Sequence, residues 1–152
     1  MPERPPDPKL EESTNRWMMG GLVLLALLVL AFPAYRLYEP GARDQAREEH
    51  ISSLIAQGET LFATNCTPCH GDRGFGATAP ALNSKQFLAA ATDDQIRSLI
   101  AVGVPGSQMA AYSLDYGGAM TLAQINALTT YLRSLEETAP DNPDWRNPLG
   151  GG

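Results

Sequence analysis

The first hydrophobic pattern in the chain is a long apolar stretch near the N-terminus. No charged residue occurs from Trp17 to Tyr35, and most of these positions are Leu, Val, Ala, Met or Gly. At about 1.5 Å per residue in a helix, the stretch nearly matches a hydrocarbon core roughly 30 Å thick. Tyr38 follows shortly after it, and aromatic rings at both ends suit the membrane interfaces. The pattern therefore predicts one membrane-spanning helix.

Helical periodicity returns after the apolar stretch. Residues 44–64 place apolar side chains on one face, and on that face the small Gly58 is followed by the large Phe62, which lets another helix cross closely. Two capping boxes, Thr92–Gln95 and Thr121–Gln124, predict the starts of two further helices. The last of these helices has an apolar side, which we expect to pack inward.

Proline and glycine separate these segments. Glu39-Pro40-Gly41 interrupts the pattern after the apolar stretch, Gly103 ends a helix, and three glycines between Gly71 and Gly76 predict a loop. The C-terminal residues form either an unstructured end or a strap that docks through Trp145. We therefore divide the chain into five parts. They are a solvated cytoplasmic tail (residues 1–16), a transmembrane anchor (17–38), a linker with the start of the first helix (39–50), a globular domain (51–136) and a Pro/Gly-rich tail (137–152).

A cleaved secretory signal is the alternative interpretation of the apolar stretch. Signal peptides have a short basic start, a shorter apolar region and a small-x-small cleavage site. Here the preceding segment is long and of mixed charge, and Pro33 disrupts the only nearby alanine sites. We therefore expect an uncleaved anchor. Charge does not set its orientation, because three basic residues flank each side: Arg4, Lys9 and Arg16 before it, and Arg36, Arg43 and Arg47 after it.

The chain is acidic, with a net charge of −6. From residue 39 onward, 13 Asp and Glu residues oppose 7 Lys and Arg residues, so the imbalance lies in that part of the chain. A basic surface is the electrostatic footprint of a protein that binds nucleic acid. We therefore expect no nucleic-acid partner.

Cys66-Thr67-Pro68-Cys69-His70 is the motif with the most specific chemistry. Two cysteines three positions apart, with a histidine directly after the second, form the attachment pattern of a c-type haem. One tight turn presents both sulfurs to the porphyrin vinyl groups while His70 reaches the iron, which leaves no thiol for a disulfide. A thioredoxin-like thiol site fits less well, because it needs a strand before the motif. A zinc site lacks a fourth ligand, since the only other histidine is His50.

An iron held by His70 has a second face, which either takes another protein ligand or stays open. The protein candidates are Met109, Met120 and His50. Most methionines serve only as core packing, so their position has to decide. Met109 lies in a Pro/Gly loop between two helices, which can cross the opposite face of a haem. Met120 sits beside a helix cap and His50 lies on the helix before the motif, so position favours Met109.

These motifs together resemble the small monohaem class I cytochromes c, over about residues 51–136. One position departs from the family pattern, because Ala110 replaces the proline that often follows the ligand methionine. The matching motifs occur in the family's order. Cys66-x-x-Cys69-His70-Gly71 is followed by a G-x-G…P-x-L run ending at Pro80 and Leu82, and then by the ligand loop Gly103–Met109, with Tyr112 where an aromatic usually follows. Leu128-x-x-Tyr131 resembles the signature of a terminal helix that crosses the first helix at a glycine and an aromatic, here Gly58 and Phe62.

The resemblance implies an all-α cytochrome c fold, with helices around one covalent haem c and no sheet. It also implies that the Pro80 carbonyl accepts a hydrogen bond from the imidazole of His70. Attachment in this family occurs outside the cytoplasmic membrane, so we expect a single-pass inner-membrane protein with a periplasmic haem domain. The residues that the resemblance assigns to the haem are Cys66 and Cys69 as thioethers, His70 and Met109 as iron ligands, and Pro80, Leu82 and Tyr112 around them.

Ligation by His and Met raises the potential of a haem and fills both axial positions, which suits electron transfer rather than oxygen or peroxide chemistry. The resemblance therefore implies a one-electron carrier, not an enzyme, tethered in the lipid bilayer. We expect it to join membrane-embedded subunits of a respiratory or photosynthetic complex, such as alternative complex III, and to pass electrons from a quinol-oxidising unit to a soluble or membrane acceptor. The alternatives are a free membrane-tethered shuttle and a haem peroxidase or gas sensor.

Overall fold

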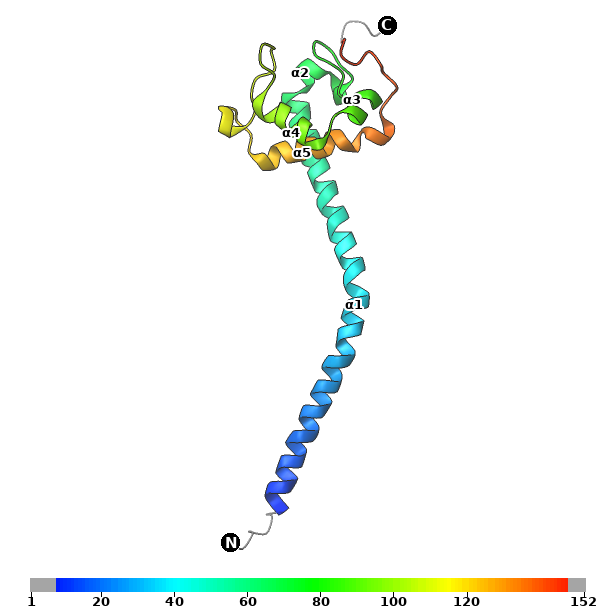
Figure 1. The fold of residues 1–152 in the computed structure, drawn as a ribbon, viewed down its shortest axis with the longest axis vertical. Helices are drawn as coiled ribbons and strands as arrows, with labels where there is room; N and C mark the ends of the chain where they lie inside the picture. Colours follow the sequence, from blue (N-terminus) through cyan, green and yellow to red (C-terminus); the bar gives the residue numbers. More distant parts are fainter. Residues whose placement is uncertain (1–7, 148–152) are drawn as a thin grey trace. The chain divides into compact units, whose positions relative to one another are not determined.

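The computed structural model describes residues 8–147, and this part of the chain is mostly helical (Figure 1). Within it the only β-type pairing is an isolated bridge between Ser113 and Met120, so no sheet forms among these residues. The all-α expectation is thereby confirmed. The elements, in chain order, are α1 (Pro8–Asn65), α2 (Thr67–His70), η1 (Asp72–Gly74), α3 (Lys85–Ala90), α4 (Asp93–Val102), η2 (Leu114–Tyr116), α5 (Leu122–Ser134) and η3 (Glu136–Thr138).

Helix α1 is longer than the sequence pattern predicts. It runs from Pro8 to Asn65 without a break and includes Pro33 and Pro40. The expected interruption at Glu39-Pro40-Gly41 is therefore wrong, and the helix already includes residues 8–16 of the expected tail. Proline is tolerated in the first turn of a helix, where its missing N–H has no partner to lose. Each internal proline removes one hydrogen bond, but the long helical segments on both sides continue the helix cooperatively. The rest of the expected tail, residues 1–7, lies outside the described part of the chain.

The apolar part of α1 has no protein partner within the described structure. Its large apolar side chains from Trp17 to Tyr35 are 55–80% exposed. The helix is long and apolar enough to cross a membrane, by length and composition. In water such a surface would be costly, at roughly 25 cal/mol for each Å² of apolar area.

The chain divides into two compact units, and the second begins at Glu48. Its core joins the last turns of α1 to α3, α4 and α5. Gly58 of α1 has no space for a side chain, because a β-carbon there would lie 2.6 Å from Cβ of Tyr131 and still closer to the carbonyl oxygen of Ala127. One turn later the ring of Phe62 meets that of Tyr131, with centroids 5.5 Å apart. The predicted crossing of α1 and α5 is confirmed.

Local capping signals set the start of the shorter helices. The capping boxes at Thr92 with Gln95 and at Thr121 with Gln124 are both formed, and Gly103 caps the end of α4. Helix α3 was not predicted. Its cap is the buried Ser84, whose hydroxyl accepts a hydrogen bond from the backbone N–H of Phe87.

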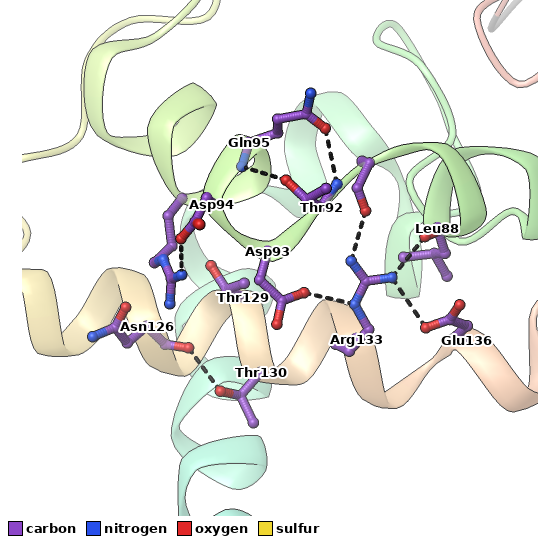
Figure 2. A network of polar contacts seen from close by, with 12 residues as sticks. Leu88, Thr92, Asp93, Asp94, Gln95, Asn126, Thr129, Thr130, Arg133 and Glu136 are labelled. Carbon is purple, nitrogen blue, oxygen red and sulfur yellow. Dashed lines mark hydrogen bonds and ion pairs between the residues drawn. The ribbon is translucent and has the colours of Figure 1, made fainter.

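Arg133 of α5 ties α3, α4 and η3 together (Figure 2). Its guanidinium donates to the carbonyl oxygens of Leu88 at 2.6 Å and Ala91 at 2.7 Å, which lie at the end of α3. It also pairs with Asp93 at 2.8 Å and Glu136 at 3.0 Å. One planar cation thus satisfies carbonyls that the short helix α3 cannot satisfy itself.

Candidate haem-binding site

The Cys-x-x-Cys-His motif forms one helical turn directly after α1. The backbone N–H of Cys66 donates to the Phe62 carbonyl at 2.8 Å, and that of His70 donates to the Cys66 carbonyl at 2.9 Å. Cys66 is half-buried against the core, whereas Cys69 is exposed, and both are free thiols. The end of α1 therefore positions the turn that carries both sulfurs and the imidazole.

His70 has a fixed ring orientation. Its Nδ1 lies 2.8 Å from the carbonyl oxygen of Pro80. A carbonyl oxygen only accepts, so Nδ1 carries the proton and donates it. The other nitrogen, Nε2, then has a free lone pair, which is the form in which histidine binds a metal. The contact that the family resemblance implies between these two residues is present.

The glycine-rich loop between His70 and Pro80 folds back on the motif. The N–H of Gly76 donates to the His70 carbonyl at 2.7 Å, and that of Ala79 donates to the Cys69 carbonyl at 2.8 Å. Gly71 has φ +75°, and a β-carbon there would lie 2.5 Å from the Gly76 carbonyl oxygen. A side chain at residue 71 would therefore push the loop away, and with it Pro80.

The Cys66 thiol does not have the lowered pKa of a reactive redox cysteine. Burial, with a smaller effect from Cys69, raises the pKa of the Cys66 thiol to about 11. A catalytic thiol needs the opposite shift, because the thiolate is the nucleophile. Among residues 8–147 no group of three His, Cys, Asp or Glu side chains is arranged to hold a metal ion. The thioredoxin-like thiol site and the zinc site, the two alternatives to haem attachment, therefore lose support.

The backbone of Met109 is held by two hydrogen bonds and passes close to Gly103. Its carbonyl accepts from the N–H of Val104 at 3.0 Å, and its own N–H donates to Oγ of Ser107 at 3.1 Å. Gly103 has φ +75°, and a β-carbon there would lie 2.5 Å from the Met109 carbonyl oxygen. The Met109 side chain is half-buried against the core. The loop thus presents a thioether at a defined position.

The other two candidates for the second iron ligand lie elsewhere. Met120 is only 4% exposed and belongs to the hydrophobic core. His50 is exposed on α1. Met120 is therefore part of the core packing and His50 lies outside the core, and ligation of the iron by Met109 stays a prediction.

Tyr112 links the Met109 loop to the cysteine turn. Its hydroxyl donates to the carbonyl oxygen of Asn65 at 3.2 Å, directly before Cys66. Burial raises the pKa of Tyr112, with smaller effects from the two cysteines, so the hydroxyl stays a protonated donor. Gly118 supports this arrangement, since a β-carbon there would lie 2.5 Å from Cα of Tyr112. Sequence reasoning missed Gly118, and the only local signal was the Gly117-Gly118 pair.

Leu82 and Asn83 follow Pro80 and contact Gly74 of the glycine-rich loop. Leu82 is half-buried against the core, and its N–H donates to the Gly74 carbonyl at 2.8 Å. Asn83 is only 5% exposed, and its Oδ1 has no hydrogen-bond partner among the described residues. An unpaired buried oxygen costs about 1–3 kcal/mol, so this residue is suited to a donor from a bound group or an ordered water. Sequence reasoning missed Asn83.

These observations fit a covalent haem. Two free thiols lie one turn apart beside an imidazole with a free Nε2, and a thioether is carried by a separate loop held by hydrogen bonds. This donor set has the soft sulfur and nitrogen ligands that haem iron takes in cytochromes c.

Comparisons with known proteins agree with this donor set. The family model described as cytochrome c matches residues 55–136, which is over half of the chain. The chain is 36% identical over 100 residues to the cbb3-type cytochrome c oxidase subunit FixP of Azorhizobium caulinodans, covering 62% of this chain and 34% of the relative. It is 38% identical over 107 residues to FixP of Bradyrhizobium diazoefficiens, covering 62% and 36%.

The chain thus spans about a third of the length of these curated relatives. Among solved structures, cytochrome cL of Methylophaga aminisulfidivorans aligns with a TM-score of 0.46 and 30% identity. The alignment covers 54% of this chain and 53% of that chain.

Proposed function

Because the chain belongs to the cytochrome c family and its cofactor is therefore haem c, we propose that it is a membrane-tethered one-electron carrier that serves a respiratory electron-transfer complex. The observation that carries this proposal is the 2.8 Å contact between His70 Nδ1 and the Pro80 carbonyl, which leaves Nε2 for the iron. An imidazole oriented in this way inside a Cys-x-x-Cys-His turn has no evident use other than haem ligation.

Each site residue has a distinct role in the proposal. Cys66 and Cys69 would hold the haem by thioether bonds, and His70 and Met109 would be the iron ligands. The haem supplies a one-electron change between ferric and ferrous iron. Pro80 fixes the ring of His70, while Gly103 and Tyr112 hold the Met109 loop. With two protein side chains as iron ligands, the chain would keep oxygen and peroxide from the metal.

The exposed apolar surface from Trp17 to Tyr35 supports a membrane anchor. Lipid chains would cover side chains that nothing covers within the described structure, and a single helix satisfies its own backbone in a bilayer. We place the haem domain on the periplasmic side of the inner membrane, because both cysteines must meet the haem outside the cytoplasm. In this arrangement residues 1–16 lie in the cytoplasm, residues 17–38 cross the membrane, and the linker 39–50, the haem domain 51–136 and the tail 137–152 lie in the periplasm.

The relatives favour a terminal oxidase as the partner. Both FixP proteins carry the name of a subunit of a cbb3-type cytochrome c oxidase. We therefore propose that this chain passes electrons, received from a quinol-oxidising unit, towards an oxidase in the same membrane. A quinol-oxidising complex such as alternative complex III is the less favoured parent. Purification in mild detergent tests this proposal: haem-bearing oxidase subunits should accompany the chain, whereas a partner-free protein would indicate a free shuttle.

The optical spectrum tests the carrier itself. The extracted protein should show a c-type haem and the weak near-infrared band of sulfur-ligated ferric iron. Met109→Leu should abolish that band, whereas Met120→Leu, a matched change in the core, should keep it. A wild-type protein with a c-type haem but without the band would contradict the carrier and favour a peroxidase or gas sensor.

A further inference from the structure

The C-terminal residues 139–147, here called the C-terminal strap, pack against α3 and lie outside the residues that the family model matches. Ala139 is buried in the core at the start of the strap. Polar contacts then fix the strap to the start of α3. The N–H of Lys85 donates to the Pro140 carbonyl at 3.1 Å, and Oγ of Ser84 donates to the Asn142 carbonyl at 3.2 Å. The side chain of Gln86 binds the strap twice, since its Oε1 accepts from the N–H of Asn142 at 2.9 Å and its Nε2 donates to Asp141.

Trp145 anchors the end of the strap. Its ring packs against Phe87 of α3, with centroids 5.1 Å apart and an angle of 57° between the planes. The guanidinium of Arg146 lies 4.4 Å from the centroid of the same indole. The ring is half-buried against the core. The backbone of Trp145 is therefore held at a fixed place beside the loop that ends at Leu82.

The carbonyl of Trp145 accepts a hydrogen bond from the N–H of Ala81 at 2.8 Å. That N–H belongs to the same peptide group as the Pro80 carbonyl, which accepts from His70. In a trans peptide the oxygen and the hydrogen point to opposite sides, so His70 and Trp145 bind the two ends of one peptide. Linked hydrogen bonds polarise one another, so the bond at Ala81 makes the Pro80 oxygen a stronger acceptor.

We propose that the C-terminal strap is a positioning element for the proximal histidine, in which Trp145 sets the hydrogen bond between Pro80 and His70 and so tunes the haem. This inference rests on the proposed function, since it requires His70 to ligate the iron. A stronger acceptor at Nδ1 makes the imidazole more basic, which favours ferric over ferrous iron. The strap therefore lowers the midpoint potential.

Trp145→Ala in the full-length, haem-loaded protein tests the inference. The midpoint potential should rise, and the Nδ1 proton of His70, followed by NMR in the ferrous protein, should exchange roughly threefold to tenfold faster, the factor that the loss of one net hydrogen bond gives. Trp145→Phe keeps an aromatic ring against Phe87 and should restore both values. The near-infrared band should not change in either variant, because the Met109 loop is untouched.

Two further variants separate positioning from simple loss of stability. Gln86→Ala removes the side-chain contacts to Asp141 and Asn142 and should shift the potential in the same direction, even if Trp145→Ala does not fold. Arg133→Lys weakens the packing of α3 without contacting the Pro80 peptide, so it should lower the melting temperature and leave the potential alone. A lower melting temperature in Trp145→Ala with unchanged potential and proton exchange would overturn the inference. A wild-type protein without His and Met ligation would instead overturn the proposed function.

Discussion

Gly58 of α1 and Ala127 of α5 lie so close that no side chain fits between the two helices at this point. The contact fixes where the end of α1 crosses the core. The cysteine turn then begins at Cys66, directly after α1 ends. The position of the haem-binding residues thus depends on a glycine that carries no chemistry.

Gly58→Ala should destabilise the domain strongly. The added methyl group meets backbone and a Cβ atom, neither of which can rotate away, so overpacking of about 1–3 kcal/mol is expected. Chemical denaturation followed at the haem absorbance measures the change. Gly41→Ala is the matched control, because nothing lies within 4 Å of that position on the same helix, and it should leave the domain's stability unchanged. Equal effects of the two substitutions would contradict the crossing.

Gly103→Ala should weaken ligation by Met109. The new β-carbon would press on the Met109 carbonyl, and the positive φ adds strain. We expect the near-infrared sulfur band to diminish and carbon monoxide to bind the ferrous protein more readily. Gly106→Ala has a similar φ of +78° but open space around it, so it separates strain from displacement and should have the smaller effect.

Tyr112→Phe should loosen the same loop by a different route. It removes the hydrogen bond to Asn65 and should cost about 0.5–1.5 kcal/mol in stability. Because burial raises the pKa of Tyr112, the hydroxyl stays protonated through the neutral range. The bond's contribution is present below pH 10, the ordinary tyrosine value, and is lost as the pH rises through the higher pKa of the folded state. An alkaline titration of the near-infrared band measures this step, which Tyr112→Phe should remove and exposed Tyr116→Phe should retain.

Arg133→Ala should cost about 1–3 kcal/mol, because it leaves the carbonyls of Leu88 and Ala91 without their charged donor. Arg97→Ala is the comparison: it removes only an exposed pair with Asp94 and should cost about 0–1 kcal/mol. Thermal unfolding of both variants checks the difference. Comparable losses would mean that the Arg133 contacts add little.

Local chemistry explains which parts of the fold could be predicted. The caps at Thr92 and Thr121 depend on residues three positions apart, so the starts of α4 and α5 are visible in the sequence. The crossing at Gly58 and the contact of His70 with Pro80 were accessible because they belong to a family pattern. The position of each iron ligand, by contrast, stays a prediction until a haem-loaded protein is measured.

The remaining features depend on contacts between distant segments. Helix α3 has only six residues, and its stability comes from Arg133 and the C-terminal strap, neither of which periodicity reveals. Asn83 and Gly118 matter through what surrounds them and not through their neighbours in sequence. The continuity of α1 through Pro40 was missed because a single proline signal was given more weight than helix on both sides of it.

The order of the segments along the chain has a consequence for assembly. The cysteine turn follows α1 directly, whereas α5, which closes the core over Gly58, comes later in the chain. A chain that emerges from its N-terminus therefore exposes Cys66 and Cys69 before their final surroundings exist. Haem attachment can precede closure of the fold, and α5 then packs around a cofactor that is already bonded to the chain.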